Sequence, residues 1–242
     1  MKVGIVTQAR MTSSRLPGKV LCKAGGRTML DHHLDRLTAI GQPIYIATTT
    51  NGSDDPIVDL AQERGVGTFR GSENDVLARF MGCALTFGLD AVVRVTSDCP
   101  LIDGKFVMQG IQEFLDADNP WLYISNTITR TFPRGMDFEV FSTEALQDAY
   151  DHASEAYQRE HVTPYLYERN NSRMTLINVP YRTNRSFYRL TLDTSEDLAL
   201  LTTLIEDYRA ETLNLDSIVT ILDANPALTA INRAVEQKKL NE

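Results

Sequence analysis

The sequence predicts an α/β fold, a three-layer sandwich with a mostly parallel, Rossmann-like mixed sheet. Short runs rich in Val and Ile alternate with amphipathic segments, which is typical of strands alternating with helices. The runs are nearly continuous in apolarity, as expected for strands that are covered on both faces. No internal repeat or low-complexity linker interrupts this alternation, so we expect residues 1–242 to form a single domain.

The first half of the chain carries the clearest expected elements. Its core strands are expected at Val3–Thr7, Ile44–Thr48, Val66–Phe69 and Ala91–Thr96. Its helices are expected at Met29–Ile40, Ile57–Arg64 and Val76–Phe87. In the last of these, apolar side chains recur at helical spacing, at Leu77, Phe80, Met81, Ala84 and Leu85. This stripe therefore predicts a face that packs into the core.

The second half of the chain has a mixed pattern. Strands are expected at Asp137–Phe141, Met174–Val179 and Tyr188–Leu192, with helices at Thr143–His152 and Arg159–Arg169. The C-terminal part is expected to be helical at Ser195–Tyr208, Leu215–Asp223 and Ala227–Lys239. The segment around 119–141 contains Pro120, Pro133 and Gly135. We expect it to be a lid or a dimerisation segment.

Composition excludes several classes of protein. A net charge of −8 argues against non-specific nucleic-acid binding. No run of about 18 apolar residues is present, so we expect no membrane span. The three cysteines are odd in number and lack C-x-x-C spacing, which argues against a disulfide framework or a zinc site. The N-terminus lacks the pattern of a signal peptide, so we expect a cytoplasmic protein.

The first 30 residues are the most unusual stretch of this acidic chain. They contain no Asp or Glu and six basic side chains: Lys2, Arg10, Arg15, Lys19, Lys23 and Arg27. An acidic protein that keeps acids out of one segment is expected to bind an anion there.

Within this stretch, the loop Gln8–Lys19 follows the first expected strand. It combines three cations with three hydroxyl groups: Arg10, Arg15, Lys19, Thr12, Ser13 and Ser14. Ligands of open parallel sheets bind beyond the carboxyl ends of the strands, and Arg, Lys and backbone N–H groups bind phosphate. Pro17 and Gly18 are expected to turn the chain so that Lys19 points back at the same anion. The alternative is an ordinary solvated loop; the spacing does not match a Walker A motif.

Two aspartates are expected at the ends of strands. Asp98 follows Ala91–Thr96, and Asp193 follows Tyr188–Leu192. Two such carboxylates can converge on one Mg²⁺, which prefers one or two carboxylates plus substrate oxygens. The alternatives are structural: Asp98 as a turn residue before Pro100, and Asp193 as a residue that helps to cap the next helix.

Seven blocks of the sequence carry a family resemblance. They are Ala9–Lys19, Phe69–Ser72, Asp75–Phe80, Val93–Asp103, Ser125–Thr127, Arg159–Tyr165 and Leu190–Leu198. Together they resemble the cytidylyltransferases that make CMP-activated acidic sugars, including the CMP-sialate and CMP-KDO synthetases. The chain is most similar to the group typified by the spore-coat polysaccharide biosynthesis cytidylyltransferase-like proteins. This resemblance spans nearly the whole chain.

The resemblance implies the fold of nucleotide-diphospho-sugar transferases, a homodimer, and CTP and a small acidic acceptor as partners. It implies that Asp98 and Asp193 hold Mg²⁺, and that catalysis involves Arg10, Arg15, Lys19 and Asp98. The nucleotide-binding residues it implies are Gln8, Ala9, Arg10, Ser13, Ser14, Arg15, Lys19, Gly71, Ser72, Asp75, Arg79 and Thr96. Asp75 and Arg79 also have a simpler interpretation, an i,i+4 ion pair on one helix.

The acceptor is expected to bind to the second half of the chain. Candidate acceptor-binding residues are Asn126, Arg130, Arg134, Asp137, Glu139 and His161. The alternative for each is a solvated polar side chain or, for His161, a structural one. The chain lacks the His-x-Ser-Gly-Thr block of the KDO-activating enzymes, which argues against KDO itself as the acceptor.

These features predict an in-line displacement, in which an acceptor oxygen attacks the α-phosphorus of CTP and pyrophosphate leaves. One alternative is a glycosyltransferase that uses a nucleotide sugar, although Asp98-Cys99-Pro100 does not match the D-x-D metal motif of such enzymes. A second alternative is a catalytically degenerate paralogue that binds nucleotide only.

Overall fold

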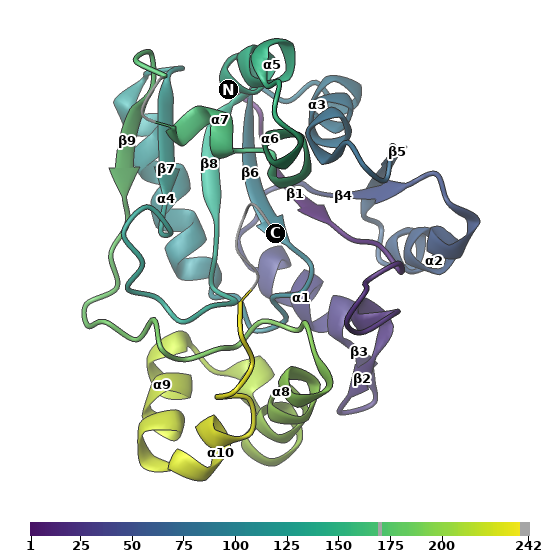
Figure 1. The fold of residues 1–242 in the computed structure, drawn as a ribbon, viewed down its shortest axis with the longest axis vertical. Helices are drawn as coiled ribbons and strands as arrows, with labels where there is room; N and C mark the ends of the chain where they lie inside the picture. The colour runs from purple at the N-terminus through teal and green to yellow at the C-terminus, as the bar shows by residue number, and fades with distance from the viewer. Residues whose placement is uncertain (169–170, 238–242) are drawn as a thin grey trace.

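A seven-stranded mixed sheet forms the centre of the molecule (Figure 1). The structure is a computed structural model and describes residues 1–168 and 171–237. The strand order is β5-β4-β1-β6-β8-β7-β9. The strands are β1 (Val3–Gln8), β4 (Ile44–Thr49), β5 (Gly67–Gly71), β6 (Ala91–Thr96), β7 (Leu122–Ser125), β8 (Glu139–Ser142) and β9 (Thr175–Asn178). A short hairpin, β2 (Lys23–Ala24) and β3 (Arg27–Thr28), lies outside this sheet.

Most strand pairs are parallel. Strands β5, β4, β1 and β6 run in one direction, so their carboxyl ends lie along one edge of the sheet. Strand β8 is antiparallel to both β6 and β7, and β9 is parallel to β7. The expected three-layer α/β architecture with a mostly parallel mixed sheet is therefore confirmed.

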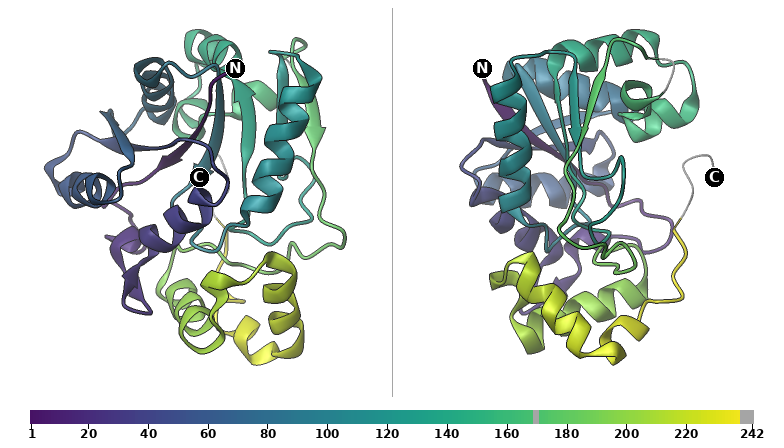
Figure 2. Two further views of the ribbon diagram at one scale, coloured as in Figure 1. Left: turned by 180° about the vertical axis from the view of Figure 1, so that it is seen from behind. Right: turned by 90° about the vertical axis from the view of Figure 1, so that its left-hand side faces the viewer.

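Helices cover both faces of the sheet. The α-helices are α1 (Met29–Thr38), α2 (Asp55–Glu63), α3 (Val76–Phe87), α4 (Gly104–Ala117), α5 (Thr143–His152), α6 (Ala156–His161), α7 (Pro164–Tyr167), α8 (Ser195–Tyr208), α9 (Leu215–Ala224) and α10 (Pro226–Ala230). Short 3-10 turns are η1 (Lys19–Leu21), η2 (Gly52–Asp54) and η3 (Ala210–Thr212). Seen from behind, α4 lies lengthwise against the sheet (Figure 2).

The two faces of β1 show why the layers form. Val3 and Ile5 are buried in a cluster with residues of α1 and α4, whereas Val6 is buried with residues of α3. Alternate side chains of a strand point to opposite faces, so an apolar run of this kind has to be covered twice. Each Val or Ile side chain that is fully buried stabilises the fold by roughly 1.5–3 kcal/mol.

The C-terminal helices α8, α9 and α10 form a separate layer at one end of the molecule (Figure 1). Their core includes Leu201, Ile205 and Ile218, and it also buries Phe132 and Tyr181 from two earlier loops. These loops therefore connect the sheet to the C-terminal helices.

Three helices match the sequence expectation at both ends. These are α3, α5 and α8, and each begins after a side chain that accepts a hydrogen bond from the backbone of the first turn. The caps are Asp75, Ser142 and Thr194, which are residue types that favour helix starts.

Other elements differ from the expectation. Tyr188–Leu192 is not a strand: its ladder is limited to one bridge between Arg189 and Arg134. Helix α4 and strand β7 were not expected. The expected helix Arg159–Arg169 is divided into α6 and α7 because Pro164 has no N–H to continue α6. The expected helix Ala227–Lys239 is reduced to α10, and its residues from 238 on lie outside the described part.

The segment 119–141 contributes directly to the core. It contains β7 and the start of β8, and Phe132, Met136 and Phe138 between them are buried. Most of its length is therefore integrated into the molecule. Its expected role as a lid or in dimerisation stays a prediction.

Within the described residues, we found no helix with the length and apolarity needed to cross a membrane.

Candidate active site

The loop after β1 folds back on itself. Gly18 has a left-handed backbone with φ of 69°, which glycine adopts without steric strain, and its N–H donates to the carbonyl of Met11 at 2.9 Å. The N–H of Met11 in turn donates to the buried carboxylate of Asp54 at 2.8 Å. These contacts fix both arms of the loop and direct Lys19 at the carboxyl edge of the sheet.

Lys19 joins two aspartates that are distant in the sequence. Its Nζ atom lies 2.8 Å from Oδ2 of Asp98 and 2.7 Å from Oδ1 of Asp193. Burial alone would lower the pKa of Lys19, but the attraction of the two carboxylates raises it above its usual value. Lys19 is therefore a permanent cation at neutral pH.

Asp98 lies just beyond the end of β6. Burial would raise its pKa, but the charge of Lys19 and hydrogen bonds from Lys19, Thr96 and Cys99 lower it to about 2. Within the described residues, its carboxylate accepts no backbone hydrogen bond, so the alternative of a turn aspartate is wrong. The carboxylate is instead an ionised group that faces a cation.

Asp193 lies between three cations. Its Oδ2 atom is 3.1 Å from Arg15 and 2.9 Å from Arg189, while its Oδ1 atom binds Lys19. Helix α8 is capped by a reciprocal pair, Thr194 and Asp197, so the carboxylate of Asp193 does not cap it. Asp193 is available to the site even though no strand precedes it.

A buried chain of hydrogen bonds holds the residues on both sides of Asp98. His33 contacts the carbonyl of Cys99 through Nδ1 at 2.9 Å and the hydroxyl of Thr7 through Nε2 at 2.9 Å. A carbonyl only accepts, so the Nδ1–H donates to it and Nε2 accepts from Thr7. Thr7 then accepts from Ser97 at 2.8 Å. Nothing in the local sequence singles out His33, because its partners are 26 and 66 positions away.

Lys19, Asp98 and Asp193 line a cavity of about 680 Å³. It is lined by Gln8, Ala9, Arg10, Ser13, Ser14, Arg15, Lys19, Val20, Glu73, Asn74, Val76, Arg79, Thr96, Asp98, Ala156, Glu160, His161 and Asp193. We call it the first cavity. Most of the residues that the sequence analysis named for the nucleotide lie here, together with both candidate metal ligands.

Several lining residues were not named as candidates. Glu73 binds Arg10 and Thr12 from the loop, and also Asn51 at 2.7 Å. Glu160 extends from α6 beside His161. Glu160 lies within the block Arg159–Tyr165, and Glu73 lies between the blocks Phe69–Ser72 and Asp75–Phe80. Their place in or beside these blocks was the available signal.

The segment between β5 and α3 has a structural role as well. Asp75 caps α3 and forms an ion pair with Arg159. Arg79 is buried and donates to the carbonyls of Ser72 and Glu73 at 2.8 and 3.3 Å. The i,i+4 ion pair between Asp75 and Arg79 is therefore wrong. Gly71 and Ser72 adjoin the first cavity without lining it.

The candidate acceptor residues do not gather at one place. His161 lines the first cavity, whereas Arg134 lines a second cavity described below. Asn126 is buried and donates to the carbonyl of Met136 at 2.7 Å.

The other three acceptor candidates bind partners within the protein. Arg130 and Asp137 form a two-bond ion pair, at 2.6 and 2.7 Å. Glu139 is buried against Arg94 and Tyr123. None of the three lines the first cavity.

The donor set of the first cavity fits a hard divalent cation. One atom, Nζ of Lys19, touches both Asp98 and Asp193, so a single small cation can reach both carboxylates. Mg²⁺ is commonly held by one or two carboxylates, with phosphate and water oxygens completing its shell. No group of three or more His, Cys, Asp or Glu side chains suited to a metal occurs in the described residues, so substrate oxygens would be needed.

Comparisons with known proteins agree with this geometry. Residues 3–238 match the family model described as cytidylyltransferase. The chain is 33% identical over 232 residues to the spore coat polysaccharide biosynthesis protein SpsF of Bacillus subtilis, covering 91% of this chain and 94% of that protein. It superposes on the structure of a cytidylyltransferase from Leptospira borgpetersenii with a TM-score of 0.90, at 34% identity, over 99% of this chain and 100% of that chain.

A more distant structure shares the fold. It is a CMP:2-keto-3-deoxy-manno-octonic acid synthetase complexed with CTP, with a TM-score of 0.62 at 19% identity, over 85% of this chain and 98% of that chain. The family model and the relative of high coverage decide the family: the chain belongs to the cytidylyltransferases.

Proposed function

We propose that this protein transfers CMP from CTP to an oxygen of a small acidic sugar or a related acidic acceptor and releases pyrophosphate. The observation that carries the proposal is the convergence of Lys19, Asp98 and Asp193 in a cavity also lined by Arg10 and Arg15. The cations of the loop can bind a polyphosphate, and the paired carboxylates can hold a metal ion that assists the reaction of that polyphosphate. The family supports cytosine as the base.

The loop binds the triphosphate in this proposal. Among the residues that the structure describes, Arg10 pairs with Glu73 alone, in a partly exposed pair at 3.4 Å, so it can turn to a phosphate at small cost. Arg15 lies beside Asp193, at 3.1 Å, so in this proposal it binds near the α-phosphate. Ser13 and Ser14 offer hydroxyl groups to the same oxygens.

Asp98 and Asp193 would hold Mg²⁺. When bound there, Mg²⁺ neutralises charge on the phosphate oxygens and orients them. Because Lys19 stays protonated, its ammonium group can move from the carboxylates to a phosphate oxygen when the substrate binds. The arginines and Lys19 thus stabilise the charge that develops on the leaving pyrophosphate.

The reaction requires no covalent intermediate on the protein. An acceptor oxygen forms a bond to the α-phosphorus, the bond from this phosphorus to the bridging oxygen breaks, and the electron pair leaves with pyrophosphate. His161 and Glu160 line the same cavity as the loop. They are the side chains in place to contact an acceptor and to accept its proton. The name of the Bacillus subtilis relative supports a role in making surface polysaccharides.

The test is release of pyrophosphate from CTP, compared with UTP, ATP and GTP, across a panel of sugar acids and uncharged sugars. We expect release with CTP, Mg²⁺ and an acidic acceptor. Asp98→Asn should lower turnover by several orders of magnitude with the fold intact. Asp90→Asn is the matched control, because Asp90 is exposed at the opposite end of β6 and should leave turnover unchanged.

Two results would overturn the proposal. The first is release of a nucleoside diphosphate from a nucleotide sugar, which indicates a glycosyltransferase. The second is tight CTP binding with no turnover on any acceptor, which indicates a protein that only binds nucleotide.

A further inference from the structure

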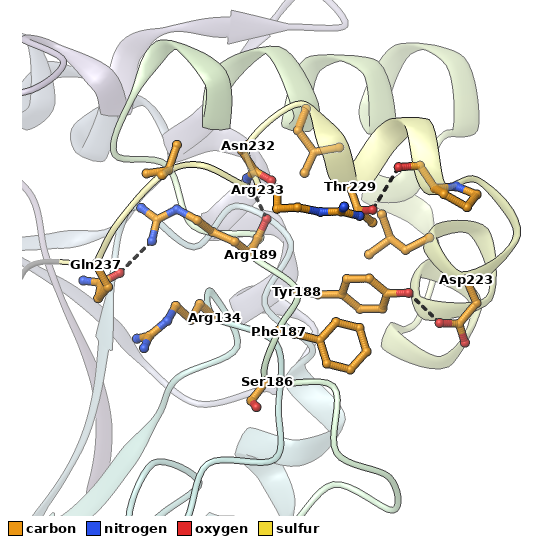
Figure 3. Close-up of a pocket in the computed structure, with 14 residues that line it drawn as sticks. Arg134, Ser186, Phe187, Tyr188, Arg189, Asp223, Thr229, Asn232, Arg233 and Gln237 are labelled. Atoms are coloured by element: carbon orange, nitrogen blue, oxygen red, sulfur yellow. Dashed lines mark hydrogen bonds between the residues drawn. The ribbon is translucent and has the colours of Figure 1, made fainter.

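A second cavity, of about 670 Å³, lies on the side of the C-terminal helices (Figure 3). It is lined by Arg134, Ser186, Phe187, Tyr188, Arg189, Leu200, Leu222, Asp223, Pro226, Thr229, Asn232, Arg233, Val235 and Gln237. None of these residues lines the first cavity. The segment 186–189, the helices α8 to α10 and the described chain after α10 build it together.

Among the described residues, the positive charge in the second cavity is not fully balanced. Three arginines line it, against one carboxylate, that of Asp223. Asp223 is fully engaged, because its two oxygens bind Tyr188 at 2.5 Å and Arg185 at 2.8 Å. The side chains of Arg134 and Arg233 have no hydrogen bond or ion pair in the part of the chain that the structure describes.

Arg134 is additionally placed among like charges. Burial lowers the pKa of Arg134, and the nearby guanidinium groups of Arg130 and Arg189 lower it further, against the opposing effect of Asp137. Each of those neighbours is already paired, Arg130 with Asp137 and Arg189 with two carboxylates. Asp137 already pairs with Arg130, so an anion bound beside Arg134 would relieve the repulsion that Asp137 offsets only in part.

Part of the remaining wall of the second cavity is apolar. Tyr188 and Phe187 lie side by side with ring centroids 4.5 Å apart, and Phe187 is 67% exposed. Leu200, Leu222 and Val235 also line the cavity. In Figure 3 the two rings lie below the Arg233 side chain, and Arg134 and Gln237 lie towards the other end. A flat ring fits beside such aromatic and guanidinium groups, which favour stacking.

We propose that the second cavity binds a small organic anion, a phosphate or carboxylate attached to a flat ring. Arg134 binds the anionic group, and the ring lies between the side chain of Arg233 and the rings of Phe187 and Tyr188. This site goes beyond the proposed transfer reaction, because it shares no lining residue with the first cavity. Its position is nevertheless adjacent: Arg189 lines the second cavity and binds Asp193 of the first at 2.9 Å.

The probe is phenyl phosphate, titrated calorimetrically into the full-length protein. Arg134→Gln should weaken its binding about tenfold or more, the usual effect of losing a charge-assisted hydrogen bond. Arg233→Gln should also weaken its binding, because the ring loses the guanidinium group beside it. Phe187→Ala should weaken phenyl phosphate and leave the affinity for inorganic phosphate unchanged. These side chains are partly or fully exposed, so the variants should fold, which thermal unfolding checks.

Arg15→Gln is the matched control, because Arg15 lines the first cavity alone. It should leave this binding of phenyl phosphate unchanged. The proposal is overturned if phenyl phosphate shows no saturable binding up to millimolar concentration. It is also overturned if only Arg15→Gln weakens binding, since the probe then occupies the first cavity. Both results can be obtained without CTP, so they are independent of the transfer reaction.

Discussion

Lys19 and Asp98 are joined by a hydrogen bond of 2.8 Å between Nζ and Oδ2, although 79 positions separate them in the chain. The same ammonium group reaches Asp193 at 2.7 Å. The cation therefore occupies the place between two carboxylates at which Mg²⁺ is proposed to bind. In this proposal, the lysine and the metal ion would compete for these oxygens until substrate phosphates bind and accept hydrogen bonds from the lysine.

Lys19→Gln should have opposite effects on turnover and on the binding of a divalent ion. Turnover should fall by about 10²–10³, as when one preorganised donor is removed from a site of developing charge. Binding of a divalent ion to the substrate-free protein should become tighter, because no ammonium group competes. Mn²⁺ titration followed by electron paramagnetic resonance measures the second effect, and pyrophosphate release measures the first.

Lys23→Gln is the control for this pair of measurements, because Lys23 is an exposed cation of the neighbouring β2 strand. It should change neither quantity. Weaker Mn²⁺ binding in Lys19→Gln would contradict the competition and would show that the lysine supports the metal site.

The stability of the protein should depend on pH through His33. Burial lowers the pKa of His33 to about 4, against the opposing effects of the Cys99 carbonyl and Asp98. The folded state keeps this imidazole neutral, while the unfolded chain binds a proton below about 6.5. The contribution of neutral His33 to the free energy of unfolding is therefore complete above this pH and decreases as the pH falls towards 4. The decrease is about 2 kcal/mol between pH 7 and pH 5.

Urea unfolding at the two pH values measures this loss. His33→Gln has no titrating group at this position, so the difference between pH 7 and pH 5 should become smaller by that amount. An unchanged difference would show that His33 does not contribute to the pH dependence.

The parts of this structure that the sequence predicted are those with local causes. Helix α3 begins at its Asp75 cap and carries its apolar stripe within 12 residues, so its limits could be predicted. Asp98 was expected at a strand end because the apolar run of β6 stops just before it. Local pattern was sufficient in both cases.

The parts that could not be predicted depend on distant partners. Tyr188–Leu192 has the composition of a strand, but its backbone bonds to Arg134 and Asp98 in loops, so no ladder forms. Arg189 looks like an ordinary surface cation in the sequence. In the structure it is buried against Asp197, and only the packing of α8 against the loop brings the two together.

Arg189→Met should destabilise the fold strongly. Arg189 binds both oxygens of Asp197, at 2.8 and 2.9 Å, and Asp197 is fully buried. Removal of one partner of a buried ion pair costs about 3–5 kcal/mol, because the other charge stays buried without an opposite charge beside it. Thermal and urea unfolding measure the change.

Arg185→Met is the matched control for Arg189→Met. Arg185 binds Asp223 at 2.8 Å, but both side chains are partly exposed, so the loss should be below about 1 kcal/mol. Equal losses in the two variants would contradict the assignment of a buried ion pair.

Gly135→Ala tests the close approach of two loops below the site. Gly135 has φ of +93°, and a Cβ atom there would lie 2.5 Å from the backbone carbonyl of Leu190, which cannot move without displacing the segment that leads to Asp193. Gly26 also has a positive φ, of +79°, but a Cβ atom there meets nothing within 4 Å.

Gly26→Ala should cost about 1–2 kcal/mol for the backbone conformation alone. Gly135→Ala should cost clearly more and should lower turnover as well. Similar unfolding free energies for the two variants would mean that the loops can separate without consequence, and would contradict a role of this close approach in positioning Asp193.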